Sequence, residues 1–250
     1  MKRPTLSLVT ICWNADQTLA KTLESVLQQT ILPNEYLFVD GGSTDGTLAL
    51  LETYRPRFIE RGCAFKVIPQ QRLPGQAGIP SAWNQAIPLA KGEIVALLNA
   101  DDWYEPTTLQ EVLEAFSSDV DAVVVPVAMH AENPANDWLF LPQSLAKLPW
   151  KMPIPHPGSF FRRNVYDRVG LYDTRYRISA DYDFMWRCHL AGIQWCYLTE
   201  HPLVHMRLGG LANSSRALAR KETYRIARLH SAWCDPRPLI AFLGRTLTGR

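Results

Sequence analysis

Short apolar runs alternate with amphipathic stretches through the first hundred residues of the chain. Residues 6–11 form a β-branched apolar run, and a polar turn at 14–16 follows it. Apolar side chains then recur at the spacing of one helix face, at Leu19, Leu23, Val26 and Leu27. Asp16 or Thr18 is a suitable residue to begin this helix. The pattern predicts a strand followed by a helix.

The same order of strand and helix repeats further along. More strands are predicted at 36–39, 65–68, 94–98 and 122–127, and more helices at 45–54, 81–90, 107–116, 181–190 and 214–229. In the second helix, Leu48 and Leu51 are predicted to face inward. The run at 94–98 lacks polar alternation, which is typical of a strand buried on both faces. We therefore expect an α/β fold with a doubly wound, mostly parallel sheet flanked by helices.

The second half of the chain is less regular. Residues 129–157 are rich in Pro, Trp and Asn and have no clear period, so we expect an irregular insertion there. No repeat and no linker divides the sequence. The 250 residues are therefore expected to form one domain.

Composition and charge exclude several classes of protein. With 47% hydrophobic residues the chain can bury a core, which excludes a disordered protein. A net charge of +2 gives no electrostatic footprint for nucleic acid. The five cysteines are scattered and suggest a reducing, cytoplasmic setting. Neither a signal peptide at the start nor an apolar run of membrane-spanning length is recognisable.

Polar residues follow three of the predicted strands. Thr10 to Asn14 end the first strand, Asp40 ends the second, and residues 99–102 end the strand at 94–98. In open parallel sheets ligands bind beyond the carboxyl ends of the strands, so these residues predict a binding site at one sheet edge.

Asn99-Ala100-Asp101-Asp102 carries the most chemical information. Two adjacent carboxylates repel each other unless a cation or solvent screens them. Oxygen ligands of this kind suit Mg²⁺ or Mn²⁺ holding a diphosphate. A pair of acids that only precedes a helix is the structural alternative, and the tetrapeptide by itself leaves both open.

A second polar segment runs from Asp40 to Thr47, with the sequence DGGSTDGT. Its glycines and hydroxyls suit a tight turn that begins a helix, whereas a turn does not require Asp40, which could accept hydrogen bonds from an imide or a ribose. Neither a P-loop nor a G-x-G-x-x-G pattern follows the first strand, which disfavours those nucleotide folds.

Taken together, these segments resemble the family-2 glycosyltransferases of the GT-A fold, of the bacterial surface-polysaccharide type. The resemblance covers about residues 5–210 and rests on four stretches in the right order: TICWN at 10–14, TLESVLQQT at 22–30, DGGSTDGT at 40–47 and LNADD at 98–102. It implies a nucleotide-diphosphate sugar donor, most often a UDP-sugar, a divalent metal, and direct displacement with inversion at the anomeric carbon.

The resemblance also implies roles for residues on the nucleotide side. Thr10 and Asn14 match the segment that lines the nucleotide pocket, and Asp40 matches the acid that reads the base. Asn84 resembles the Asn of an Arg-Asn pair beside the diphosphate, although Trp83 stands where the basic residue is common.

Asp101 and Asp102 match the Asp-x-Asp motif, with Asn99 in place of its first Asp. They are the implied ligands of Mn²⁺ or Mg²⁺, Asp102 the more direct one, and Asp101 also contacts the nucleotide. His205 could complete the metal shell or be structural, and Arg207 nearby could bind phosphate.

The general base is implied in the second half of the chain. Asp181 aligns with the catalytic Asp of the Glu-Asp motif, although Ala180 replaces the Glu. At a helix N-terminus its pKa is expected to be lowered by the helix dipole, which would weaken it as a base. Asp183 is the alternative base or an acceptor contact. His156 and Trp103 are further candidates for contact with the sugar or acceptor, and His156 could equally cap its loop.

The C-terminal region is basic and then apolar. Cations at 216, 220, 221, 225 and 228 precede an apolar stretch at 238–245. This region could hold the enzyme at the inner leaflet of the membrane, or it could be a solvated helix packed on the domain.

The sequence therefore predicts a metal-dependent, inverting glycosyltransferase that transfers a sugar to a hydroxyl of a glycan or lipid-linked acceptor. We expect a nucleotide-binding half at about 5–102, an acceptor and catalytic half at about 103–212, and a basic C-terminal helix and tail at about 213–250. A nucleotidyltransferase or pyrophosphorylase, and an inactive module that binds sugar nucleotides, are the alternatives.

Overall fold

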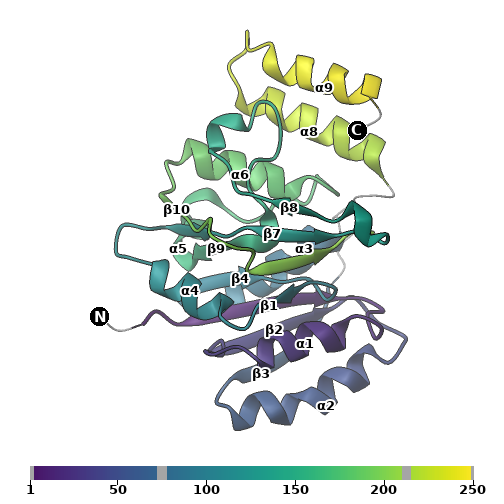
Figure 1. Ribbon diagram of the computed structural model, residues 1–250, viewed down its shortest axis with the longest axis vertical. Coiled ribbons are helices and arrows are strands. Elements are labelled where there is room, and N and C mark those ends of the chain that lie inside the picture. The colour runs from purple at the N-terminus through teal and green to yellow at the C-terminus, as the bar shows by residue number, and fades with distance from the viewer. Residues whose placement is uncertain (1–2, 72–77, 210–214, 249–250) are drawn as a thin grey trace.

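A seven-stranded sheet forms the centre of the protein in the computed structural model, which describes residues 3–71, 78–209 and 215–248 (Figure 1). Its strands in spatial order are β10 (Trp195–Tyr197), β6 (Ala122–Val124), β9 (Ser159–Arg162), β4 (Ile94–Leu97), β1 (Leu6–Cys12), β2 (Glu35–Asp40) and β3 (Ala64–Pro69). Only β9 runs antiparallel to its neighbours. The expectation of a mostly parallel α/β sheet is confirmed.

Helices cover both faces of this sheet (Figure 1). One core cluster joins the sheet to α1 (Leu19–Leu27), α2 (Thr47–Glu60) and α4 (Thr108–Ala115). The opposite cluster joins it to α3 (Gly78–Ala86), α5 (Arg163–Val169) and α6 (Ala180–Leu190). Among the described residues, short 3₁₀ turns at η1 (Ile87–Leu89), η2 (Pro134–Asn136), η3 (Leu145–Lys147) and η4 (His156–Gly158) complete the connections.

The hydrophobic pattern of the sequence agrees with the observed burial of side chains in β4 and α1, and differs from it in α2. All four residues of β4 are buried, as the unbroken apolar run indicates. The four apolar side chains of α1 are buried on one face. In α2, however, Leu48 is 42% exposed, so its predicted inward orientation is wrong. The helix also runs past the predicted end at residue 54, and Phe58 in its last turn is fully buried.

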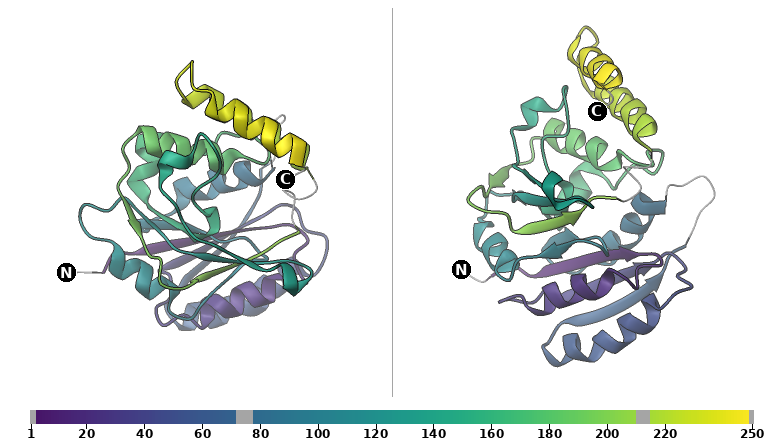
Figure 2. Two further views of the ribbon diagram at one scale, coloured as in Figure 1. Left: turned by 45° about the horizontal axis from the view of Figure 1, so that its top comes forward. Right: turned by 45° about the vertical axis from the view of Figure 1, so that its right-hand side comes forward.

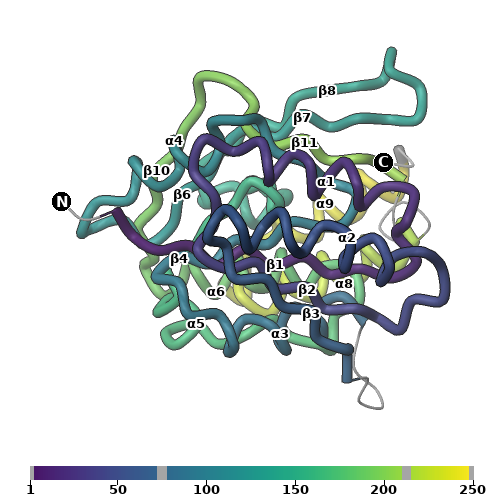
Figure 3. Tube along the Cα trace, turned by 90° about the horizontal axis from the view of Figure 1, so that it is seen from below, coloured from purple at the N-terminus to yellow at the C-terminus, as the bar shows by residue number. Residues whose placement is uncertain are grey.

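A second, four-stranded sheet lies beside the first, and the hydrophobic pattern does not predict it. Its order is β5 (Trp103–Tyr104), β11 (Val204–Arg207), β7 (Val127–His130) and β8 (Trp138–Phe140). The single strand expected at 122–127 is in fact two, β6 and β7, because Pro126 lacks the N–H that would continue the ladder. The β7–β8 hairpin falls within the stretch expected to be irregular, and Figure 3 shows it projecting beyond the body of the domain.

Gly158, at the end of η4, lies in a space that admits no side chain. A Cβ there would lie 2.6 Å from the carbonyl oxygen of Val125 and 2.8 Å from a methyl of Val127. We expect Gly158→Ala to lower the free energy of unfolding by about 1–3 kcal/mol, the usual cost of overpacking. Urea unfolding would measure it, with Gly78→Ala as the control because nothing lies within 4 Å of its Cβ position. An unchanged midpoint for Gly158→Ala would contradict the steric argument.

Two antiparallel helices, α8 (Arg216–His230) and α9 (Arg237–Thr248), form the outer end of the molecule (Figures 1 and 2). The helix expected at 214–229 corresponds to α8, although Ser214 lies outside the described residues. Ile226 and Ala227 of α8 belong to the same core cluster as α6. Within the described part of the chain, no helix has the length and apolarity needed to cross a bilayer.

Candidate active site

The carboxyl ends of β1, β2 and β4 meet at one edge of the large sheet. Cys12 at the end of β1 is paired with Asp40 at the end of β2, and Leu98, just after β4, donates its N–H to Val9 of β1 (2.9 Å). The parallel strands therefore bring Asp40 and the segment 99–102 to the same edge of the sheet, although they are far apart in sequence.

Asp40 is 5% exposed and holds the turn that follows it. Its carboxylate accepts hydrogen bonds from the N–H of Gly42 (2.9 Å), from the N–H of Ser43 (3.0 Å) and from the Ser43 hydroxyl (2.5 Å). Gly42 has φ +81°, a conformation that favours glycine. Asp40, which the resemblance implies would recognise the nucleotide base, therefore fixes the shape of the β2–α2 loop.

Asn14 connects this turn to the end of β1. It has φ 49°, its side-chain oxygen accepts the N–H of Thr44 (2.8 Å), and its own N–H donates to the Ser43 hydroxyl (2.9 Å). Thr10, in contrast, is fully buried and its hydroxyl lies 2.9 Å from that of Tyr36. The structure therefore places Asn14 at the edge and the side chain of Thr10 inside the core.

Asp101 and Asp102 follow β4 in a poorly solvated setting. Asp102 is 1% exposed, and its carboxylate accepts the N–H of Arg207 (3.2 Å) and the side-chain amide of Asn99 (3.3 Å). Burial raises the pKa of Asp102 well above its usual range, and the charge of Asp101 raises it further. Burial also raises the pKa of the half-buried Asp101, which the charge of Arg207 partly offsets.

This environment fits a divalent cation. Two carboxylates that burial and mutual repulsion make costly to ionise would both be stabilised by a +2 ion, and carboxylate oxygens suit Mg²⁺ or Mn²⁺. Asp101 is the more accessible of the two, so it presents the more available oxygen. No group of three or more His, Cys, Asp or Glu in a metal-binding arrangement occurs among residues 3–71, 78–209 and 215–248, so water or a ligand would have to complete the shell.

Both ring nitrogens of His205 are already engaged. Nε2 lies 2.6 Å from a carboxylate oxygen of Glu105, and Nδ1 lies 2.8 Å from Nε2 of His130, whose Nδ1 contacts Asp137 at 2.8 Å. Trp103 stacks on His205 with ring centroids 5.1 Å apart. His205 therefore joins the strands of the second sheet, and Trp103 has an aromatic partner within it.

His156 and Asn84 support the loop that leads to α6. His156 is 8% exposed, contacts the Tyr172 hydroxyl through Nε2 (3.0 Å) and packs on Trp83 with centroids 4.6 Å apart. Burial lowers its pKa to about 4, so it is neutral at pH 7. The side chain of Asn84 donates to the carbonyl of Tyr172 (2.7 Å) and accepts its N–H (2.9 Å).

Asp181 lies in the first turn of α6, close enough to this loop that its charge contributes to the raised pKa of the deeply buried Tyr172. Its Oδ1 accepts the N–H of Tyr182 (2.8 Å). Burial raises the pKa of Asp181 to about 6, which outweighs the hydrogen bonds that lower it, and the charge of Glu222 adds to the rise. The expectation that the helix dipole would lower this pKa is wrong, because desolvation is the larger effect.

The carboxylate of Asp183, two residues further along α6, is used differently. It is 3% exposed and contacts Nε of Arg187 (2.8 Å) and Nε2 of His230 in α8 (2.9 Å). The contact with His230 connects α6 with α8, whereas the ion pair with Arg187 lies within α6. Asp183 is consequently much less available as a base than Asp181.

Glu222 in α8 is a residue that sequence reasoning did not identify. Its carboxylate is 9% exposed and accepts three backbone N–H groups of the segment before α6, each at 2.9 Å, from Arg177, Ile178 and Ser179. A usable signal exists in the sequence, since Glu222 is the only acid in the otherwise basic α8. The structure shows that α8 supports the start of the helix that carries Asp181.

Comparisons with known proteins agree with this arrangement. The sequence model of the protein family described as glycosyl transferase family 2 matches residues 7–171 of this chain. A "PGL/p-HBAD biosynthesis glycosyltransferase" of Mycobacterium bovis is 34% identical over 219 residues, which cover 86% of this chain and 81% of that protein.

Solved structures of other proteins share the fold. TarS 1–349 of S. aureus, in complex with UDP-GlcNAc, superposes with a TM-score of 0.69 at 21% identity over 90% of this chain and 65% of that one. The present chain thus spans just under two thirds of that structure. The mannosyltransferase PcManGT of Pyrobaculum calidifontis, in complex with GDP-Man and Mn²⁺, gives a TM-score of 0.69 at 19% identity over 100% of this chain and 77% of that one.

Proposed function

Because the chain belongs to glycosyl transferase family 2 and has the GT-A fold, we propose that it transfers a sugar, with inversion, from a nucleotide-diphosphate sugar to a hydroxyl of a glycan or lipid-linked acceptor. A UDP-sugar is the donor we favour. The observation that carries the proposal is the poorly solvated pair Asp101–Asp102 at the sheet edge that also holds Asp40. We keep the division into a nucleotide half before about residue 102 and an acceptor half after it.

In the proposed reaction the acceptor hydroxyl loses its proton to the carboxylate of Asp181. Its oxygen forms a bond to the anomeric carbon while the bond from that carbon to the diphosphate oxygen breaks, and the nucleoside diphosphate leaves with the electron pair. A general base works best when its pKa lies near the working pH. A pKa of about 6 leaves Asp181 ionised at pH 7 and basic enough to accept the proton.

Asp101, with Asp102 beside it, would hold the divalent ion, which supplies charge neutralisation for the departing diphosphate. Mn²⁺ and Mg²⁺ both suit this donor set, and the structural neighbour PcManGT is described with Mn²⁺. Asn14 and Asp40 stabilise the loop that would face the nucleotide. Arg207, whose backbone is bonded to Asp102, is placed to compensate negative charge there.

Thermal shift with a panel of nucleotide sugars tests the proposal, because a ligand at 100 times its dissociation constant adds about 2.7 kcal/mol of stability. The panel contains UDP- and GDP-sugars, with Mn²⁺ or with EDTA, and mass spectrometry follows donor consumption. We expect a metal-dependent rise in melting temperature with at least one donor. If no nucleotide diphosphate shifts the transition, the proposal fails; if a donor binds but is never consumed, the chain is an inactive binding module.

We also propose that Glu222 is a positioning residue for Asp181. Glu222→Gln removes the charge and replaces an acceptor by an NH₂ group facing backbone donors, so we expect kcat to fall on the order of 10–100-fold, because small misplacements of a catalytic group have large effects. The acidic limb of the pH profile should also move to lower pH, since the Glu222 charge contributes to the raised pKa of Asp181. Donor KM should change little.

Glu60→Gln is the matched control, because Glu60 is an exposed acid at the end of α2. It should leave both kcat and the pH profile unchanged. A Glu222→Gln enzyme with normal turnover and an unshifted acidic limb would contradict the positioning role.

A further inference from the structure

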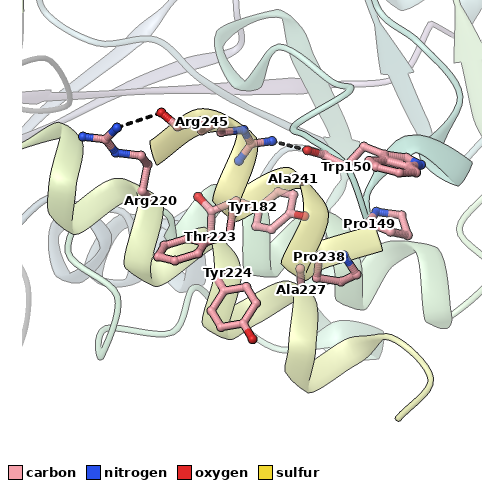
Figure 4. A pocket seen from close by; sticks show the side chains of 11 residues that line it. Pro149, Trp150, Tyr182, Arg220, Thr223, Tyr224, Ala227, Pro238, Ala241 and Arg245 are labelled. Carbon is pink, nitrogen blue, oxygen red and sulfur yellow. Dashed lines mark hydrogen bonds between the residues drawn. The ribbon is translucent and has the colours of Figure 1, made fainter. Parts of the chain in front are cut away.

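The last helix, α9, has one face that is already used inside the molecule. Pro238 and Ala241 lie against α8 (Figure 4). The ring of Phe242 packs on that of Tyr224 in α8, with centroids 4.8 Å apart. Arg245, on the same face, donates to the carbonyl of Trp150, and its own carbonyl accepts the guanidinium of Arg220 (2.9 Å) (Figure 4). These contacts fix the orientation of α9 on the domain.

The opposite face of α9 is apolar and exposed. It consists of Leu239, Ile240, Leu243 and Leu247, which are 45%, 53%, 49% and 87% exposed. At 3.6 residues per turn these four positions fall within an arc of about 100°. Trp233, in the turn between α8 and α9, is 89% exposed. A surface helix needs one apolar face to pack on its domain, so a second one indicates an external contact.

The helical pair is also strongly cationic. Residues 216–248 contain seven Lys or Arg and two Asp or Glu, a formal charge of +5 in a chain whose total is +2. Both acids are occupied within the fold, Glu222 by backbone N–H groups and Asp235 by Arg237 at 2.8 Å. The remainder of the chain therefore has a formal charge of −3, and positive charge is concentrated at the end that carries the apolar face.

From this combination we propose that the outer face of α9 binds the surface of an anionic phospholipid bilayer. Leu239, Ile240, Leu243 and Leu247 enter the interfacial region, while the cations of the α8–α9 pair attract anionic headgroups. The helix lies on the bilayer and does not cross it, since its 12 residues reach about 18 Å and the hydrocarbon core is about 30 Å thick. A second copy of the chain is a poorer partner, because two +5 surfaces would repel each other.

Sedimentation with lipid vesicles tests this inference independently of any sugar transfer. One vesicle population is phosphatidylcholine alone, and the other contains about 30% phosphatidylglycerol, enough to give the surface a negative potential. We expect the full chain to sediment with the anionic vesicles, to bind neutral ones weakly, and to dissociate at high salt, which screens the attraction.

Two sets of variants separate the apolar and the charged contributions. Leu243→Ser with Leu247→Ser should reduce the vesicle partition coefficient on the order of tenfold or more, because two leucines that would be buried in the bilayer interface are lost. Lys221→Glu with Arg225→Glu should abolish the preference for anionic vesicles. The control is Leu48→Ser, which removes a leucine of similar exposure, 42%, from α2 at the opposite end of the molecule (Figure 1).

Three results would overturn the inference. They are equal binding to neutral and anionic vesicles, unchanged binding of the double serine variant, and a dimer in light scattering that the double serine variant dissociates. The last result would assign the face to a second copy of the chain. Circular dichroism of each variant verifies that the fold is retained, as expected for substitutions at exposed positions.

Discussion

Asp181→Asn is expected to lower the turnover of sugar transfer by about 10²–10⁴-fold, the usual contribution of a general base. The amide has nearly the shape of the carboxylate and can still accept the N–H of Tyr182, but it cannot take the acceptor proton. Binding of the nucleotide should be unchanged, because Asp181 lies in α6 and we propose that the nucleotide binds at the edge formed by β1, β2 and β4. Single-turnover kinetics and a nucleotide thermal shift measure the two properties separately.

The pH dependence gives a second measurement of the same residue. For the native enzyme kcat/KM should rise with pH through about 6, because the base acts only when it is ionised. The carboxyl has a folded pKa above its usual value of 3.8, so ionisation disfavours the folded state, and stability falls as pH rises between these values. Asp181→Asn should therefore raise the melting temperature at pH 8 and have little effect at pH 4.

Asp167→Asn provides the control, since Asp167 is an exposed acid on α5. It should alter neither turnover nor the pH profile. Full activity of Asp181→Asn would place the base elsewhere, and the absence of transfer and donor hydrolysis in both native and variant protein would favour the inactive binding module.

Asp101→Asn is expected to reduce transfer by about 10²–10³-fold, comparable to the loss of one electrostatic contact to a developing charge. Metal binding should weaken because one of the two carboxylates that burial makes costly to ionise has become neutral. The metal-dependent part of the nucleotide thermal shift should disappear, and EDTA should have the same effect on the native protein. Isothermal calorimetry with Mn²⁺ measures the affinity directly.

Asp101→Asn is expected to weaken metal binding but to increase the stability of the metal-free protein. Removing the charge of Asp101 lowers the pKa of Asp102, so the variant should be more stable than the native protein at pH 7 when no metal is present. Asp167→Asn, at an exposed position of α5, is again the control and should change neither property. A variant that binds Mn²⁺ as tightly as the native protein would exclude Asp101 as a ligand.

Local pattern predicts the first half of the fold well and the second half less well. The βα units up to β4 follow from apolar runs and one-faced helices whose spacing is a property of neighbouring residues. The antiparallel insertion of β9 between β4 and β6, and the pairing of β11 with β5 and β7 in the small sheet, join segments at least 35 residues apart. Such pairing leaves little trace in the period of either strand.

The candidate site divides in the same way. The motifs at 40–47 and 98–102 could be found because each lies within a few residues of a strand end, where parallel topology directs side chains to one edge. A local motif does not show, however, whether the side chain of a candidate site residue is already hydrogen-bonded within the fold. Thr10 is bonded to Tyr36, and His205 to Glu105 and His130, through partners from distant segments.

The sequence by itself determined the order of the βα units, the strand-end acids and, through its four motifs, the family to which the chain belongs. Tertiary structure decided the pKa of Asp181, the support that Glu222 gives to the start of α6, and the outward direction of the apolar face of α9. The physical reason is that backbone preference and periodicity act over a few residues, whereas desolvation and exposure depend on every segment packed nearby. Charge and burial at the site are therefore properties of the assembled fold.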